Sequence, residues 1–167
     1  MCKRGTFVVF LVVVFGLAGQ VCADSSDSTQ IKALEARLAA AAESRNLDAI
    51  MQAYLPDDTL FVFDVVPPRQ YVGAKAFRKS WGDFLASTKG PLKYEITDLA
   101  VVPVGNVAYG HSIQRTIATG TKGEPVDLTT RVTDVYRKLN GHWVIVQEHI
   151  SIPVDLDSGK PDFASKP

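Results

Sequence analysis

Residues 131–151, RVTDVYRKLNGHWVIVQEHIS, decide the fold. Asn140-Gly141 stands between two runs that are rich in β-branched and aromatic residues. A two-residue hairpin turn needs a positive φ at both central positions, and Asn and Gly adopt that conformation most readily. Such a turn pairs Leu139 with His142 and thereby sets the partner of every other residue in the two strands. The stretch therefore predicts a long antiparallel hairpin.

In this register the two faces of the hairpin differ in chemistry. One face carries Val132, Asp134, Tyr136, Trp143, Ile145, Gln147, His149 and Ser151. An acid, an amide, an imidazole and a hydroxyl among aromatic side chains are more than a structural core needs, and they are typical of a ligand cavity. The opposite face is chiefly Val and Ile, which favours packing against a second copy of the chain. It carries Arg131, Thr133, Val135, Val144, Val146, Glu148, Ile150 and Ile152. A single bulge would swap the later assignments between the faces.

The rest of the chain predicts three helices followed by long strands. Apolar residues at Ile31, Leu34 and Leu38 recur with helical spacing. A short second helix is expected over about 47–55, and a third contains Phe77, Trp81, Phe84 and Leu85. Strands are expected over 60–66, 92–103, 106–119, 125–139 and 142–153. Helices first and antiparallel strands afterwards define an α+β fold, with the helices packed on one face of a mainly antiparallel sheet.

The N-terminus has the layout of a secretory signal peptide. Lys3-Arg4 precedes an apolar run over 7–17, and small residues near Ala23 suit cleavage. We expect residues 1–23 to be removed and the protein to be periplasmic or secreted; a retained membrane anchor is the alternative. The mature chain then comprises a disordered linker over 24–29, one domain over 30–154 and a flexible tail over 155–167.

Cleavage would remove both cysteines, Cys2 and Cys22, so that no disulfide, reactive thiol or thiolate metal site is expected. The full chain has 18 basic and 18 acidic residues without a cluster, which argues against a nucleic-acid partner. The three histidines, His111, His142 and His149, lack metal-ligand spacing. We expect neither a metal nor a cofactor, and no membrane contact after cleavage.

Several motifs together resemble a known family. They are YLPDDTLFVFD at 54–64, Pro67-Pro68, Tyr71-x-Gly73, a helix containing Trp81, and RxTxVYRxxxGxWxIVxxHIS at 131–151. In order and spacing this set resembles the SnoaL-like branch of the ketosteroid-isomerase and nuclear-transport-factor-like superfamily. The resemblance implies a cone in which three N-terminal helices close a strongly curved sheet around an internal pocket. It also implies a homodimer formed through the outer face of the sheet.

The resemblance and the predicted cavity face together give a candidate site. Ketosteroid isomerases use a general-base aspartate, and Asp64 is the nearest match, one residue later than that pattern expects. Asp134 is a second candidate base, and His149 is a candidate general acid or base that Asp134 could orient. Ordinary hydrogen bonding within the core is the alternative for both. The pocket walls are expected to include Tyr54, Phe61, Trp81, Tyr136, Trp143, Ile145, Gln147 and Ser151.

We therefore expect a small, largely apolar molecule in the cone pocket, with cofactor-free acid/base chemistry of the isomerase, cyclase or dehydratase type. The superfamily also includes non-catalytic association domains, and a fold alone does not decide between these functions. A non-catalytic, dimeric binding or association module is accordingly the alternative.

Overall fold

The computed structural model describes residues 21–163, with side chains from Ser26 onward. The predicted signal peptide lies outside this range except for its last three residues, and it stays a prediction. Within the described range, no helix is long and apolar enough to cross a membrane.

Three helices precede the long strands, as the apolar periodicity predicts. They are α1 (Val21–Glu43), α2 (Leu47–Met51) and α3 (Ala74–Ser87). α1 buries Ile31, Leu34 and Leu38, which follow one another on the same side of the helix. Asn46 caps α2, because its side-chain oxygen accepts a hydrogen bond from the N–H of Ala49.

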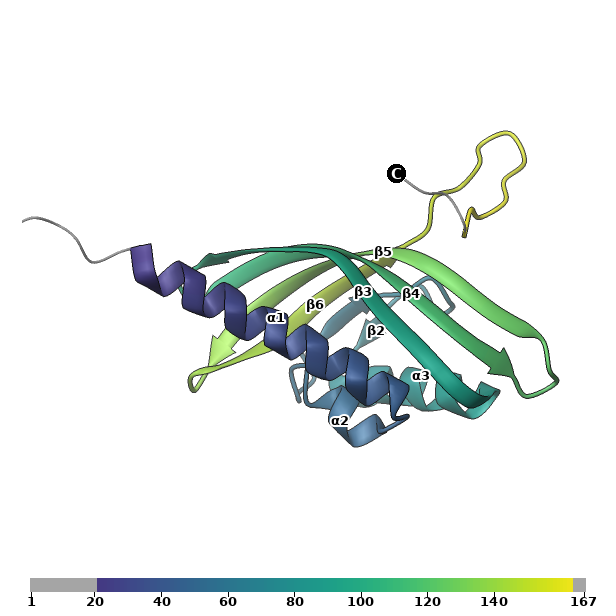
Figure 1. Ribbon diagram of the computed structural model, residues 1–167, viewed down its shortest axis with the longest axis horizontal. Coiled ribbons are helices and arrows are strands. Elements are labelled where there is room, and N and C mark those ends of the chain that lie inside the picture. The colour runs from purple at the N-terminus through teal and green to yellow at the C-terminus, as the bar shows by residue number, and fades with distance from the viewer. Residues whose placement is uncertain (1–20, 164–167) are drawn as a thin grey trace, which may run out of the picture.

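Six strands form one mixed sheet in the order β2-β1-β6-β5-β4-β3 (Figure 1). They are β1 (Phe61–Phe63), β2 (Tyr71–Val72), β3 (Thr88–Val104), β4 (Val107–Gly120), β5 (Pro125–Leu139) and β6 (His142–Ser151). β1 runs parallel to β6, and the other neighbouring pairs are antiparallel. The predicted α+β class with a mainly antiparallel sheet is confirmed.

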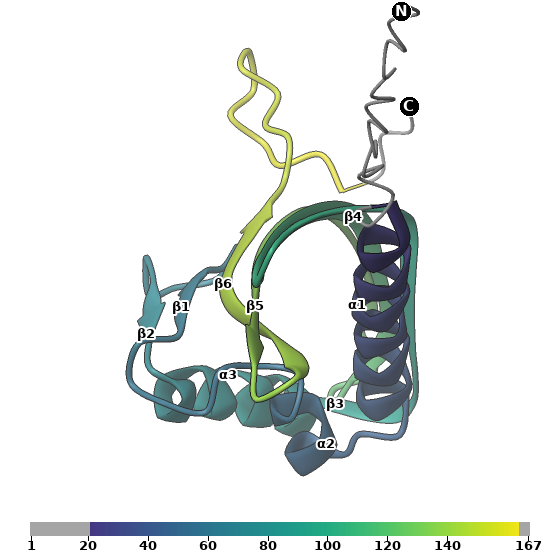
Figure 2. The same cartoon turned by 90° about the vertical axis from the view of Figure 1, so that its left-hand side faces the viewer.

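The sheet curls strongly but does not close (Figure 2). Register shifts in β3, between Lys89 and Lys93 and between Thr97 and Ala100, bend the strands at its edge. α1 packs along β3, while α3 packs against β2 and β3. The apolar core lies between these helices and the inner face of the sheet. The result is the cone that the resemblance implied.

The Asn140-Gly141 turn is confirmed, because both residues have positive φ and Leu139 pairs with His142. A bulge lies farther along the hairpin, where Tyr136 pairs with Ile145 but Val135 pairs with Gln147. It inserts one extra residue into β6, so that the side chains beyond it change face.

The bulge overturns part of the predicted cavity face. Glu148, expected outside, points into the cone and is only 2% exposed. Ile150, also expected outside, lines the internal pocket. His149 is exposed, and its ring contacts that of Phe63 at 5.3 Å on the outer face. The predicted inward placement of His149, Gln147 and Ser151 is therefore wrong, because these residues pair with the outward-facing Thr133, Val135 and Arg131.

Residues 24–29 differ from the disordered linker that was expected, because α1 runs through them. The carboxylate of Asp27 accepts hydrogen bonds from Lys138 Nζ at 2.6 Å and from Trp143 Nε1 at 3.2 Å. The hydrogen bond from Lys138 lowers the pKa of Asp27. These contacts tie the start of α1 to the β5–β6 hairpin.

The expected flexible tail also contains local structure. Val154 bridges to Pro161, and Asp155 Oδ1 accepts a hydrogen bond from the N–H of Ser158 at 2.7 Å. This hydrogen-bonded turn projects away from the sheet (Figure 2), and its Leu156 is exposed. Its flexibility stays a prediction.

Candidate functional site

A cavity of about 420 Å³ opens between α3, the loop after β1 and the inner face of the sheet. Its lining comes from α3, from the chain at 64–71 and from the four strands β3 to β6. The volume lies within the usual range for small-molecule sites, roughly 300–1,000 Å³. The curl of the sheet therefore leaves a space that side chains do not fill.

Five aromatic side chains form much of the wall: Tyr71, Phe77, Trp81, Phe84 and Tyr94. The Trp81 ring contacts Phe84 edge-on at 6.0 Å and lies tilted to Tyr94 at 5.9 Å. Phe77, Trp81 and Phe84 share one side of α3 because they are spaced by three to four residues. Such a wall suits a flat apolar molecule.

Asp64 lines the pocket from the loop that follows β1. Its carboxylate Oδ1 accepts a hydrogen bond from the N–H of Val65 at 2.6 Å, which takes the chain out of the strand and explains why β1 ends earlier than predicted. Burial raises the pKa of Asp64, against the lowering effect of the backbone hydrogen bonds. No lysine or arginine in the described range forms an ion pair with it.

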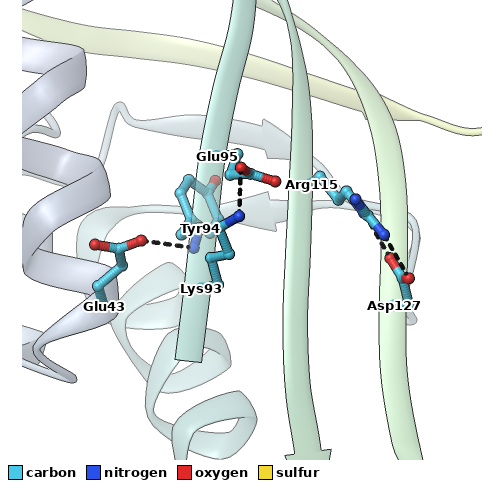
Figure 3. A network of polar contacts seen from close by, with 6 residues as sticks. All are labelled: Glu43, Lys93, Tyr94, Glu95, Arg115 and Asp127. Atoms are coloured by element: carbon cyan, nitrogen blue, oxygen red, sulfur yellow. Dashed lines mark hydrogen bonds and ion pairs between the residues drawn. The ribbon is translucent and has the colours of Figure 1, made fainter. Parts of the chain in front are cut away.

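Polar side chains on the sheet complete the lining. The hydroxyl of Tyr94 donates a hydrogen bond to Gln114 Oε1, and Gln114 in turn donates to Ser112 Oγ at 3.4 Å. Glu43, at the end of α1, accepts a hydrogen bond from the backbone N–H of Tyr94 at 3.2 Å (Figure 3). Since β3 is an edge strand, this bond both satisfies its backbone and fixes Tyr94 against the pocket.

One donor in the wall has no protein partner. Trp81 Nε1 is buried without a hydrogen bond, although buried polar groups are paired in most proteins. The second indole, that of Trp143, donates to Asp27 and lies outside the pocket. Trp81 Nε1 is therefore a group that a ligand oxygen could satisfy.

Next to the pocket lies a buried network of carboxyl and phenol groups. The Tyr136 hydroxyl lies 2.8 Å from Glu35 Oε1 and 3.3 Å from Asp134 Oδ2. Asp134 faces Glu148 across β5 and β6 and is hydrogen-bonded to it, and the Tyr54 hydroxyl donates to Glu148 Oε2 at 3.0 Å. None of these five side chains lines the pocket. The Tyr54 ring, however, packs edge-on against the ring of Phe77 at a centroid distance of 5.0 Å, and Phe77 lines the pocket.

The network holds protons that exposed carboxyls lose at neutral pH. Burial raises the pKa of Glu35 to about 7. Burial, reinforced by the charges of Glu148 and Glu35, raises the pKa of Asp134 well above its usual range, and burial likewise raises the pKa of Glu148. Two carboxyls in contact share a proton, because two negative charges at that distance repel each other.

The structure divides the predicted site residues into four groups. Asp64 and Trp81 line the pocket. Tyr54, Asp134 and Tyr136 belong to the buried network, while Trp143 and Ile145 are core residues. Phe61 packs on Phe63, away from the buried Val62, and with His149, Gln147 and Ser151 it lies outside the cavity. His111, whose orientation the sequence leaves open, is exposed.

Sequence reasoning missed Glu35, Glu148, Tyr94 and Gln114. Glu35 has a signal in the sequence, because it stands four residues after Ile31 and three before Leu38, on the apolar side of the helix. Glu148 could be found only with the bulge in place. Within the described residues, no group of three or more His, Cys, Asp or Glu side chains could hold a metal ion.

Fold and pocket together define a cone-shaped α+β domain with a hollow interior. The model of the SnoaL-like domain family matches residues 31–155, and the chain belongs to this family. A comparison with curated proteins gives no match.

Solved structures show the same architecture. An NTF2-like protein of unknown function from Pseudomonas putida KT2440 is 27% identical over 86% of this chain and 98% of its own, with a TM-score of 0.76. A candidate dehydratase of the NTF2-like family from Streptomyces avermitilis is 18% identical over 77% of this chain and 97% of its own, with a TM-score of 0.67. A candidate calcium/calmodulin-dependent protein kinase type II association domain from Thiobacillus denitrificans ATCC 25259 is 21% identical over 74% and 94%, with a TM-score of 0.60. The last two likenesses show the fold alone.

Proposed function

We propose that this chain binds a small, largely apolar molecule in the pocket between α3 and the inner face of the sheet. The observation that carries the proposal is the cavity of about 420 Å³ with five aromatic side chains in its wall. Apolar surface that lines a cavity lacks contact partners, so that a ligand with a flat body would gain burial there. The unpaired Trp81 Nε1 favours a ligand that also carries an oxygen acceptor.

Native mass spectrometry of the full chain, recovered from its own host, tests this function. We expect a retained small molecule on the wild-type protein. Leu128→Trp, which fills the pocket from β5, is expected to abolish retention. Thr129→Trp is the matched control. Thr129 follows Leu128 in β5, so its side chain points to the opposite face of the sheet, away from the pocket.

Equal retention by the two variants would contradict the proposal. A ligand-free wild type that also fails to bind a neutral aromatic probe, 2-naphthylmethanol, would contradict it as well.

Acid/base catalysis is a second candidate function, favoured by Asp64. It is a carboxyl group in the pocket wall with a raised pKa, which is the state that a general base needs near neutral pH. For any turnover that is found, Asp64→Asn is expected to lower kcat by roughly 10²–10⁴-fold. Asp134→Asn is expected to lower kcat less than Asp64→Asn does, because Asp134 does not line the pocket. Unchanged kcat in Asp64→Asn would exclude Asp64 as the general base, and a chain without any turnover would remain a non-catalytic binding module.

A further inference from the structure

The charged residues in the pocket wall are all acidic. They are Asp64 and Asp83, and no Lys, Arg or His stands among the lining residues. Asp83 is balanced by Lys79, whose Nζ lies 2.5 Å from its carboxylate on the exposed side of α3. Asp64 forms no ion pair within the described residues, and the pocket therefore carries one carboxylate without a counter-charge.

The aromatic side chains of the wall add to this negative character. The faces of the aromatic side chains carry partial negative charge and attract cations within about 6 Å. A ligand carboxylate or phosphate would meet repulsion here and would find no basic partner to replace its water.

We propose that the preferred occupant is an organic amine, with its ammonium group against Asp64 and a flat apolar body among the aromatic side chains. An ammonium would give a counter-charge to the carboxylate that burial has partly stripped of water, whereas a neutral ligand would leave that charge unbalanced. The proposal rests on the binding function and not on the catalytic one. A carboxylate paired with an ammonium is a weaker base, so that a strong preference for amines would count against Asp64 as a general base.

Three probes that share one ring system test the proposal: 2-naphthylmethylamine, 2-naphthylmethanol and 2-naphthoate. Isothermal titration calorimetry with the full chain at neutral pH gives the three dissociation constants. We expect the amine to bind about ten-fold more tightly than the alcohol, and the carboxylate more weakly than either.

Asp64→Asn is expected to bring the amine to the affinity of the alcohol, so that the ten-fold preference for the amine is lost. Asp127→Asn is the matched control: it alters net charge equally, but Asp127 lies outside the pocket in an ion pair with Arg115. It is expected to keep the preference for the amine.

The wild-type protein alone already decides the outcome. Binding of the alcohol with an equal or weaker affinity for the amine would overturn the preference for amines and leave the binding function standing. Binding of none of the three probes would overturn both.

Discussion

Replacing Glu35 by glutamine is expected to flatten the pH dependence of folding. Glu35 is 1% exposed, its Oε1 accepts a hydrogen bond from Tyr136, and its Oε2 has no partner. At pH values below the ordinary glutamate pKa, the carboxyl is neutral in both the folded and the unfolded chain. As the pH rises, the unfolded chain loses this proton first, because burial holds it on the folded protein. The stability that the raised pKa contributes is therefore lost on going from acid to neutral pH.

The magnitude follows from the two pKa values. With a pKa of about 7 in the folded state and the ordinary glutamate value of 4.5 in the unfolded chain, Glu35 alone is expected to remove about 2–3 kcal/mol of unfolding free energy between pH 5 and pH 8. Asp134 and Glu148 act in the same direction, since burial raises the pKa of each. Glu35→Gln removes the first contribution and part of the charge repulsion that raises the pKa values of the other two.

Urea denaturation of both proteins at several pH values between 5 and 8 measures the effect. The slope of unfolding free energy against pH is the readout, because glutamine leaves N–H groups unpaired and lowers stability at every pH. Glu124→Gln, at an exposed turn, is the matched control and is expected to keep the wild-type slope. Equal slopes for the wild type and Glu35→Gln would refute the assignment of a buried, protonated carboxyl.

Three further substitutions test the packing and the assembly. Gly110→Ala is expected to lower stability by about 1–3 kcal/mol in urea denaturation, because a Cβ there would lie 2.9 Å from the carbonyl oxygen of Ala100 and 3.2 Å from the ring of Tyr136. Gly82→Ala, where the new Cβ meets Leu47 at an ordinary 3.5 Å within α3, is expected to raise stability by up to about 1 kcal/mol, and a loss there would contradict this reasoning. We also propose a homodimer through the outer sheet face, where Val102, Val104, Val107 and Tyr109 are exposed. Light scattering is expected to give a dimer for the wild type and a monomer for Val104→Glu. A monomeric wild type at micromolar concentration would disprove the homodimer.

Much of the fold could be predicted because its signals are local. The Asn140-Gly141 turn depends on the φ preferences of two adjacent residues, and the structure has it where the sequence puts it. The buried stripe of α1 at Ile31, Leu34 and Leu38 depends only on helical spacing. The long strands β3, β4 and β5 likewise end within one residue of their expected ends at 103, 119 and 139.

The candidate site could be predicted only in part. Asp64 and Trp81 were identified by motifs that resemble a family, and both line the pocket. The predicted placement of His149 failed because of the bulge in β6. This bulge has no signal in the local sequence, since it depends on how the curved strand pairs with its neighbours. In the sequence, Glu35 is one of several charged residues of the helix. Its role depends on the hydrogen bond from Tyr136, which is 101 positions away in the sequence.

The sequence by itself determined the helices, the strand order along the chain and the hairpin turn, because each depends on residues that are close neighbours. Only the tertiary structure decided which polar side chains meet inside the cone. The reason is physical: strand pairing across a curved sheet sets the face of each residue, and a shift of one position reverses it. That shift placed Glu148, rather than Gln147, opposite Asp134.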